Sequence, residues 1–433
     1  MSKQTERVSR RRFLRSGAIA AGGLTILGAA SARGQAKKTL TAGLIGCGGR
    51  GTGAAHNCVQ AGKQLGVDVK IVALADVFPD RVQRTRRSVK KTGSEVPDGQ
   101  CFVGFDAYKK LVGTDVDIVL MATTPSFRPS QFEAAVKADK HVFMEKPVAV
   151  DPVGCRQMYE LGELATQKKL SVMPGTCLRH HRGYAGSRQQ IADGLIGRVL
   201  GGTIYYCTGR LGFTRRREGW TDREYMIRNW KSFCETSGDH IVEQHVHTID
   251  MLLWILGATP VAAVANGGRA RRQTGNMYDN FSIDFEFPDH VHIHSISRQI
   301  NGCWNWGNGL AFAAEKGWLH GTGGVRLWDD TKPPMPTLDW HRSMYVQEHV
   351  VLLDSILHDK AYNGTRGVTD GTLAAVMGRM AAYTGKRITW QQLTDPKAKG
   401  SLATFQCEPT PADFEADQVK APPDDVVPLP GKP

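Results

Sequence analysis

The chain has 433 residues, of which 41% are hydrophobic and 22% charged, a composition typical of a globular protein. Its 48 glycines follow no three-residue period, and no apolar run reaches the roughly 18–20 residues of a membrane-spanning helix, so collagen-like and integral membrane proteins are excluded. The net charge of +13 is concentrated at the start, where residues 1–32 carry six cations and one anion. The remaining basic clusters are short and dispersed, so we expect no nucleic-acid partner.

Residues 1–32 have the pattern of an export signal. The pair Arg10-Arg11 precedes Phe13-Leu14, a weakly apolar stretch follows over residues 17–30, and Ala30-Ser31-Ala32 offers a cleavage site between small residues. This resembles a twin-arginine signal, which predicts export by the Tat machinery to the periplasm, removal of residues 1–32 and no stable membrane insertion afterwards. A retained amphipathic anchor is the less favoured alternative, because it does not account for the arginine pair.

The nine cysteines do not form a disulfide or zinc-ribbon pattern. Their number is odd and no Cys-x-x-Cys pair occurs. Since the predicted route exports a folded protein, we expect most of them to be buried thiols.

Residues 33–176 alternate between apolar runs and helical patterns. The expected strands are residues 40–45, 69–74, 101–103, 117–121, 141–144 and 170–173. The expected helices are residues 54–65, 81–91, 108–111, 130–138 and 154–166. Continuous apolar strands separated by helices predict a parallel sheet covered on both faces, and right-handed crossovers make it a doubly wound Rossmann domain of an α/β protein.

A glycine-rich loop follows the first strand. It reads Gly46-Cys47-Gly48-Gly49-Arg50-Gly51, with a strand before it and a helix after it. In a dinucleotide-binding loop, Gly46 makes the tight turn, Gly48 allows a diphosphate to approach the backbone, and Gly51 lets the helix pack close to the strand. An ordinary glycine-rich loop is the alternative, which the strand and helix around it disfavour. We therefore expect all six residues to contact a dinucleotide.

Asp76 ends the second strand, thirty residues after Gly46. A carboxylate at this position accepts hydrogen bonds from the ribose hydroxyls and repels a 2′-phosphate, which favours NAD over NADP. Arg50 and the nearby Arg81 keep NADP open as a possibility, because a 2′-phosphate requires a cation.

Residues 177–394 are richer in β-strands and predict an α+β domain. The expected strands are residues 202–208, 261–266, 280–287, 291–298, 311–315 and 318–320, and the expected helices are residues 238–256, 346–357 and 371–382. We expect a largely antiparallel sheet with one face covered by helices and an open face that contacts another copy in a homo-oligomer. Residues 395–433 are polar and Pro-rich and predict an extended tail that wraps another surface.

Two further segments carry the most specific pattern. Residues 144–147 read Met-Glu-Lys-Pro, and residues 237–250 read Ser-Gly-Asp-His-Ile-Val-Glu-Gln-His-Val-His-Thr-Ile-Asp. With the glycine loop, they resemble the Gfo/Idh/MocA oxidoreductase family over most of residues 38–392. The resemblance implies a nicotinamide-dependent enzyme acting on a secondary hydroxyl of a sugar, polyol or sugar derivative. Exported members of this family load their cofactor before export.

The resemblance also implies roles for single residues. Lys146 matches the lysine of the family's Glu-Lys-Pro motif, close to nicotinamide and substrate, and His247 matches the catalytic histidine. Glu243 occupies the place usually held by Asp, four residues before His247 and on the same helix face. Dehydrogenation of an alcohol moves a proton to a base, and a nearby cation stabilises the developing alkoxide. We also expect Thr123, Pro125 and Glu145 to contact the cofactor.

Candidate substrate contacts follow the last Rossmann strand and lie in the second half of the chain. The expected residues are Arg179, His180, Tyr184, Asn229 and Trp230, with His181, Tyr205 and Arg210 as further candidates. Tyr and Trp rings pack against sugar C–H surfaces while polar neighbours bind hydroxyls. For each of these residues, a place in the protein core is an equally good interpretation.

The sequence also allows other roles for its histidines and two other functions. His240, Glu243 and His247 have a spacing that would allow a metal ion, but it is not that of known zinc helices, and we expect no metal. Asp250 and His245 are expected to make contacts within the fold, and His292 and His294 to be exposed or at an interface. One alternative function is an NAD-dependent glycosidase or lyase that oxidises the sugar transiently. The other is a carbohydrate-binding protein without catalysis.

Overall fold

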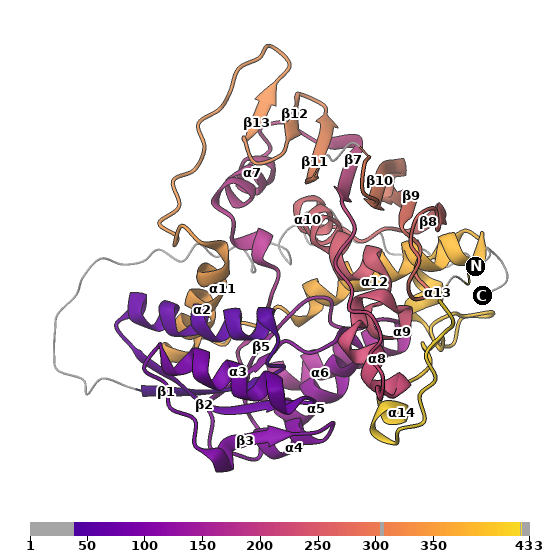
Figure 1. Cartoon of the computed structure of the whole chain (residues 1–433). Helices are drawn as coiled ribbons and strands as arrows, with labels where there is room; N and C mark the ends of the chain where they lie inside the picture. The colour runs from indigo at the N-terminus through magenta and orange to yellow at the C-terminus, as the bar shows by residue number, and fades with distance from the viewer. Residues whose placement is uncertain (1–38, 304–306, 425, 427–433) are drawn as a thin grey trace, which may run out of the picture. The chain divides into compact units, whose positions relative to one another are not determined.

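Two β-sheets organise the part of the chain that the computed structural model describes, which comprises residues 39–303, 307–424 and 426 (Figure 1). The predicted export signal in residues 1–32 lies outside these residues. Within them, no helix is long and apolar enough to cross a membrane. All nine cysteines are free thiols, five of them buried.

The first sheet is parallel and confirms the predicted Rossmann architecture. Its six strands follow the order β3-β2-β1-β4-β5-β6. The strands are β1 (Thr39–Ile45), β2 (Asp68–Asp76), β3 (Cys101–Val103), β4 (Ile118–Met121), β5 (His141–Met144) and β6 (Val172–Pro174). The strand order reverses between β1 and β4. Doubly wound folds bind their ligands at the carboxyl ends of the strands beside such a reversal.

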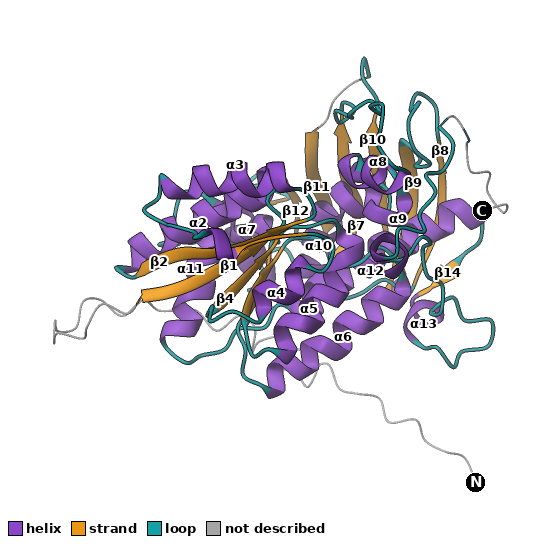
Figure 2. Cartoon of the chain, turned by 60° about the horizontal axis from the view of Figure 1, so that its bottom comes forward, coloured by secondary structure: helices purple, strands orange, loops and turns teal. Residues whose placement is uncertain are grey.

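Helices cover both faces of the parallel sheet (Figure 2). These are α2 (Gly49–Leu65), α3 (Pro79–Lys90), α4 (Ala107–Val112), α5 (Arg128–Lys137) and α6 (Pro152–Gln167). Small residues of α2, such as Ala54, Ala55 and Cys58, share one apolar core with Leu44 of β1 and with Val350 of α11 (Met344–Leu357). A second core, with α4, α5 and α6, covers the opposite face. A helix from the second half of the chain is therefore part of the nucleotide-binding half.

The second sheet is mixed and mostly antiparallel, as predicted. Its eight strands follow the order β13-β12-β11-β7-β10-β9-β8-β14, and β7 and β10 form its parallel pair. The strands are β7 (Val199–Thr208), β8 (Ala262–Gly268), β9 (Asn280–Phe287), β10 (Val291–Gln299), β11 (Gly307–Ala314), β12 (Gly317–His320), β13 (Val325–Leu327) and β14 (Ile388–Thr389). One face packs on α10 (Val246–Leu256) and α12 (Thr365–Thr384).

The open face of this sheet carries polar side chains on its central strands. His292 contacts the carboxylate of Asp284 at 2.8 Å, and His294 lies 2.9 Å from the hydroxyl of Ser282. Both histidines are exposed, as expected. The expected contact with another copy at this face stays a prediction.

The helix predicted over residues 238–256 begins later and irregularly. Gly238 has a φ of 78° and Asp239 a φ of 81°, so the backbone is left-handed where the helix was expected to start. A π-helical turn, η6 (Ile241–His245), precedes the regular helix α10. Such turns widen the helix locally and are frequent at functional sites. Here the turn carries Glu243.

The C-terminal tail packs on its own chain. It follows α13 (Trp390–Thr394) and contains α14 (Pro411–Glu415). The buried ring of Phe414 packs against Phe127 and Phe105, with ring centroids 5.5 and 6.4 Å apart, and Arg223 donates to its carbonyl at 3.0 Å. The described part of the tail therefore extends the core of the nucleotide-binding half. The predicted domain boundaries stay predictions.

The remaining helices of the described residues are short. They are η2 (Asp98–Gln100), η3 (Pro125–Phe127), η4 (Cys177–His180), α7 (Arg182–Ala192), α8 (Asp222–Arg228), η5 (Trp230–Ser232), α9 (Cys234–Ser237) and η7 (Pro288–His290).

Candidate functional site

The glycine loop connects β1 to α2 and leaves one side open. Gly46 has a φ of 97°, and a Cβ on it would lie 2.6 Å from the backbone of Ala122. A Cβ on Gly51 would lie 1.8 Å from the carbonyl oxygen of Gly46, so both positions require glycine. No atom lies within 4 Å of the Cβ positions of Gly48 and Gly49. This combination of a tight turn and an open side fits the approach of a diphosphate.

The N-terminus of α2 is free to bind an anion. Its N-cap residue, Gly48, has no side chain to cap the first N–H groups, and the first turn contains no acidic residue. The first N–H groups of a helix lack intrahelical partners, and the helix dipole makes this end favourable for phosphate. The loop and the helix thus have the properties that a dinucleotide site needs.

Asp76 is held rigidly at the end of β2. Its two carboxylate oxygens accept hydrogen bonds from the backbone N–H of Cys47 at 2.7 Å and of Phe78 at 2.9 Å. Burial raises the pKa of Asp76, whereas these hydrogen bonds and the charge of Arg81 lower it. Each oxygen retains a lone pair that can accept a bond from a ribose hydroxyl. The geometry therefore fits the predicted preference for an unphosphorylated ribose.

Replacing Asp76 by alanine is expected to raise the Kd for NAD by about 10- to 100-fold, because charge-assisted hydrogen bonds to the ribose are lost. The same variant should discriminate less against NADP. Isothermal titration with both dinucleotides measures these changes. The matched control is Asp80→Ala, since Asp80 is half-exposed and pairs with Arg84. Unchanged NAD affinity in folded Asp76→Ala protein would show that this carboxylate does not bind the cofactor.

The predicted residues Thr123 and Pro125 follow β4 at the edge that carries the glycine loop. The hydroxyl of Thr123 donates to the side chain of Gln131 at 2.6 Å, and its carbonyl accepts from Arg128. Pro125 begins η3 and is buried. A Cβ on Gly46 would lie 2.7 Å from the amide nitrogen of Thr123, so this turn and the loop are in contact. Their cofactor contacts stay predictions.

Lys146 lies directly after β5 and reaches the second half of the chain. Its Nζ donates to the backbone carbonyl of Glu243 at 2.6 Å and lies 4.0 Å from the Glu243 carboxylate. The two side chains are only 12% and 10% exposed. The structure thus brings together two residues that are 97 positions apart in the sequence. This is the strongest support for the candidate site.

His247 lies at the second position of α10, in the same region. Its imidazole is half-buried, and burial together with the positive charges of Lys146 and Arg50 holds its pKa well below the ordinary value of 6.5. The ring is therefore neutral at neutral pH and can accept a proton. Within the described residues it has no hydrogen-bond partner, which leaves both nitrogens free for a substrate.

His247 and three buried histidines have lowered pKa values, and these predict acid sensitivity. Burial lowers the pKa of His180 and His245 to about 3, and it lowers that of His349 as well. The unfolded chain keeps ordinary pKa values and so binds more protons below pH 6.5. The free energy of unfolding is thus expected to fall as the pH drops below about 6.5, by about 1.4 kcal/mol per pH unit for each of His180 and His245.

Urea unfolding between about pH 7 and pH 5 measures this dependence. The variant His245→Asn removes one of the four groups and is expected to lose less stability over this interval, by about 1.4 kcal/mol per pH unit. An equal pH slope in both proteins would contradict the assignment of His245 as neutral in the folded chain.

Arg50 has partners that the sequence did not predict. Its guanidinium contacts Glu145, from the same Glu-Lys-Pro motif, and it donates to Glu348 of α11 at 3.0 Å. The ring of Tyr345 lies 4.9 Å from the guanidinium carbon. In this structure Arg50 thus faces carboxylates, and its predicted cofactor contact, like that of Glu145, stays a prediction. The sequence around Glu348 contains no motif that indicates this contact.

Two of the five predicted substrate residues are hydrogen-bonded within the fold. Arg179 makes a bidentate pair with Asp250, at 2.8 and 2.7 Å, which confirms the expected structural role of Asp250. Asn229 accepts from the backbone N–H of Thr214 and donates to a carbonyl of α8. These bonds favour a structural role for both side chains. This agrees with the structural alternative that the sequence left open for both residues.

His180, Tyr184 and Trp230 remain candidates for substrate contact. His180 and Tyr184 are buried, and the Nδ1 atom of His180 has no partner among the described residues. Trp230 is half-buried in η5, with the ammonium of Lys231 5.4 Å from its ring centre. Of the further candidates, Arg210 donates to Thr274 at 3.2 Å, and His181 packs against Tyr184.

The side-chain alternation of β7 places Tyr206, and not Tyr205, on the site face. In the register of β7 with β10, Tyr206 lies opposite Ser297 on the face of the sheet that the helices cover. Burial and the charge of Glu243 raise the pKa of Tyr206, which places this ring near Glu243. Tyr205 lies on the open face, where a Cβ on Gly309 would meet its hydroxyl at 2.6 Å. Tyr206 is therefore a candidate substrate residue that the sequence analysis missed by one position.

His240 and His245 face the covered sheet and are separated from His247. His240 contacts Ser297 at 3.2 Å and the Asp239 carboxylate at 3.1 Å, and His245 contacts Ser295 at 2.6 Å. The described residues contain no group of three His, Cys, Asp or Glu side chains placed to hold a metal ion. His240 is thus a structural residue of the sheet–helix interface.

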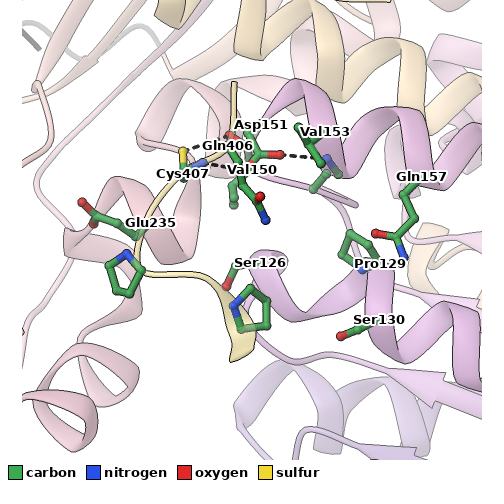
Figure 3. Close-up of a pocket in the computed structure, with 14 residues that line it drawn as sticks. Ser126, Pro129, Ser130, Val150, Asp151, Val153, Gln157, Glu235, Gln406 and Cys407 are labelled. Atoms are coloured by element: carbon green, nitrogen blue, oxygen red, sulfur yellow. Dashed lines mark hydrogen bonds between the residues drawn. The ribbon is translucent and has the colours of Figure 1, made fainter. Parts of the chain in front are cut away.

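A separate cavity of about 100 Å³ lies where the C-terminal tail meets α5 and α6 (Figure 3). The carboxylate of Asp151 joins the tail to α6 there. It accepts hydrogen bonds from the backbone N–H of Gly154 in α6 and of Cys407 in the tail, both at 2.8 Å. Neither the glycine loop nor Lys146 nor His247 lines this cavity. It is therefore distinct from the candidate site.

Comparisons with known proteins agree with this geometry. Residues 40–176 match the family model described as an oxidoreductase family with an NAD-binding Rossmann fold, GFO_IDH_MocA, and residues 184–324 match the GFO/IDH/MocA C-terminal domain. The chain belongs to the Gfo/Idh/MocA oxidoreductase family. Its first half is the family's NAD-binding Rossmann domain, and the loop, α2 and Asp76 fit that cofactor.

Two curated relatives show the range of activities among similar proteins. The chain is 28% identical over 176 residues to 2,7-anhydro-N-acetylneuraminate hydratase of Escherichia coli K12, covering 40% of this chain and 43% of that protein. It is 27% identical over 221 residues to inositol 2-dehydrogenase of Pseudomonas fluorescens, covering 50% and 55%. The chain thus spans about half the length of the curated relatives it matches.

Solved structures share the fold over a longer stretch. Apo scyllo-inositol dehydrogenase of Lactobacillus casei is 20% identical, with a TM-score of 0.61 covering 82% of this chain and 99% of that one. A levoglucosan dehydrogenase solved with NADH and levoglucosan is 16% identical, with a TM-score of 0.64 covering 81% and 99%. At these identities the likeness establishes the fold.

Proposed function

We propose that the protein is an NAD-dependent oxidoreductase that acts on a secondary hydroxyl of a sugar, polyol or sugar derivative. The observation that carries the proposal is the contact of Lys146, which follows β5, with Glu243, together with the neutral imidazole of His247, whose pKa the charge of Lys146 helps to lower. An ammonium and a neutral base that act in one site are what alcohol oxidation requires. The names of the relatives, among them inositol 2-dehydrogenase and 1,5-anhydro-D-fructose reductase, support this substrate class.

The chain's residues divide the chemistry between them. The glycine loop and the N-terminus of α2 hold the diphosphate, and Asp76 holds the ribose. When bound, NAD supplies the hydride acceptor. His247 accepts the hydroxyl proton, Lys146 stabilises negative charge on the substrate oxygen, and the Glu243 carboxylate orients a neighbouring hydroxyl or the ammonium.

Incubation of the purified protein with NAD and a panel of sugars and polyols tests the proposal. Rising absorbance of reduced nicotinamide, with a ketone as the other product, is expected for at least one member of the panel. The variant Lys146→Met, in parallel, shows that the signal comes from this site. A protein that binds NAD but neither reduces it nor converts any member of the panel would not be this enzyme.

A redox-neutral lyase or hydratase is the second candidate. The hydratases among the relatives favour it, because addition of water causes no net reduction of NAD. The same panel distinguishes the two, since a redox-neutral enzyme releases product while the amount of reduced nicotinamide in solution stays constant.

We also propose that the chain is exported by the twin-arginine pathway to the periplasm and acts there as a homo-oligomer. Support comes from the arginine pair with Phe13-Leu14 in residues 1–32, and from the open face of the second sheet. Retention of an Arg10→Lys/Arg11→Lys variant in the cytoplasm would support the export route, and its normal export would contradict it. Light scattering measures the number of subunits.

A further inference from the structure

Arg50 links three distant parts of the chain at the candidate site. It is the second residue of α2, and its Nε donates to the carboxylate of Glu145, directly after β5. Its Nη2 donates to the carboxylate of Glu348 on α11 at 3.0 Å, a residue 298 positions away. In Figure 1, α11 lies beside α2, which agrees with the close packing of these two helices. We call Arg50, Glu145 and Glu348 the carboxylate bridge.

The bridge is buried enough for its members to depend on one another. The side chain of Glu348 is 0% exposed and that of Glu145 8%, whereas Arg50 is 34% exposed. Two carboxyl groups buried this close together need a shared donor, so removal of Arg50 takes away the hydrogen-bond partner of both Glu145 and Glu348. Burial and the charge of Glu145 raise the pKa of Glu348 well above its ordinary value, although Arg50 lowers it.

Apolar side chains also join α11 to α2. Val346, Val350 and Leu353 of α11 pack in one apolar core with Ala54 and Cys58 of α2. Buried ion pairs are often no better for stability than apolar residues of the same size, and they constrain geometry more. The apolar core thus packs the helix on the sheet, and the bridge adds a constraint on the geometry of the residues that it joins.

That role follows from the residue next to Glu145. The Glu145 carboxylate is confined between Arg50 and Gly175, where a Cβ would lie 2.8 Å from its Cδ. Its amide donates to Met121 at 2.9 Å, and the next side chain, Lys146, reaches Glu243. We infer that Arg50 and Glu348 are positioning residues, which fix the turn after β5 so that the Lys146 ammonium stays at the catalytic position. The importance of this position rests on the proposed function.

The chemical reactivity of Lys146 tests the inference without any substrate. In the intact protein its Nζ is nearly buried and hydrogen-bonded, so acetylation by acetic anhydride, followed by peptide mass spectrometry, should be slow. In Arg50→Met the turn is released, and the rate at Lys146 is expected to rise about tenfold, the equivalent of one lost hydrogen bond. Glu348→Gln keeps an oxygen that accepts from Arg50 and replaces the carboxyl group by an amide, and should give a smaller rise. Arg50→Lys keeps the cation, and should restore part of the protection.

The matched control is Gln347→Leu, the neighbouring residue of α11, which bonds the backbone of His341 and not the bridge. It should leave the reactivity of Lys146 unchanged. Circular dichroism and thermal melts establish that each variant is folded, and if Arg50→Met is not, Glu348→Gln decides. Unchanged reactivity of Lys146 in a folded bridge variant, or an equal rise in the control, would overturn the inference. A wild-type protein without turnover whose bridge variants still expose Lys146 would contradict the proposed function and leave the inference intact.

Discussion

Replacing Lys146 by methionine is expected to reduce turnover by about 10³-fold while NAD still binds, because a positioned cation that stabilises a developing oxyanion contributes about this much. Methionine has nearly the length of lysine and no charge, so the packing against Glu243 is largely kept. The ammonium is 4.0 Å from that carboxylate in the intact protein. Its loss removes the interaction that strengthens as the substrate oxygen becomes negative, so kcat should fall more than KM rises.

Steady-state kinetics with the substrate identified by the panel, together with NAD titration, measures this prediction. The control is Lys137→Met, a lysine on α5 whose side chain is 66% exposed and pairs with Glu133. That variant should behave as the wild type. Turnover within a few-fold of normal in Lys146→Met would remove this lysine from the mechanism.

Replacing His247 by glutamine is expected to lower turnover by about 10²- to 10⁴-fold, the usual contribution of a general base. Glutamine keeps a polar group near the imidazole position but cannot accept the proton. In the intact protein, burial, Lys146 and Arg50 hold the pKa of His247 well below 6.5, so its neutral form persists on acidification. The rate should therefore show no decrease from protonation of this group until the pH is well below 6.5.

His245 supplies the matched control, since it lies two residues away and contacts Ser295 on the sheet. His245→Asn should lower stability and leave the pH profile of turnover in place. If the two histidine variants lose turnover equally, or if the rate falls with a pKa near 6.5 that persists in His247→Gln, another group is the base.

The local parts of the site could be predicted from the sequence. The glycine loop and Asp76 follow apolar strands directly, so the connection order alone places them at one sheet edge. Lys146 and His247 were found through motifs whose family resemblance carried their roles. The contact between Lys146 and Glu243 then required only that the second half of the chain fold back over the first.

Contacts between residues far apart in the sequence, and the face of a strand on which a side chain lies, could not be predicted in this way. Glu348 reaches Arg50 across 298 positions, and nothing near either residue indicates the pairing. Tyr205 and Tyr206 differ only in the face of β7 that they occupy, which depends on the register with β10. The backbone is left-handed at Gly238 and Asp239, so the helical segment with Glu243 begins only after these residues. The apolar periodicity of the sequence continues across them and therefore does not indicate this start.

A crystal structure of the protein with NAD bound is the most direct test of the central claim, that Lys146 and His247 serve one bound dinucleotide. The account predicts the diphosphate at Gly48 and Gly49, a ribose on Asp76, and the nicotinamide with the Lys146 ammonium and the His247 imidazole on the same side of its ring. A substrate hydroxyl oxygen should then fit within roughly 3–3.5 Å of both groups. A nicotinamide ring placed where only one of the two side chains, or neither, can reach a shared substrate would contradict it.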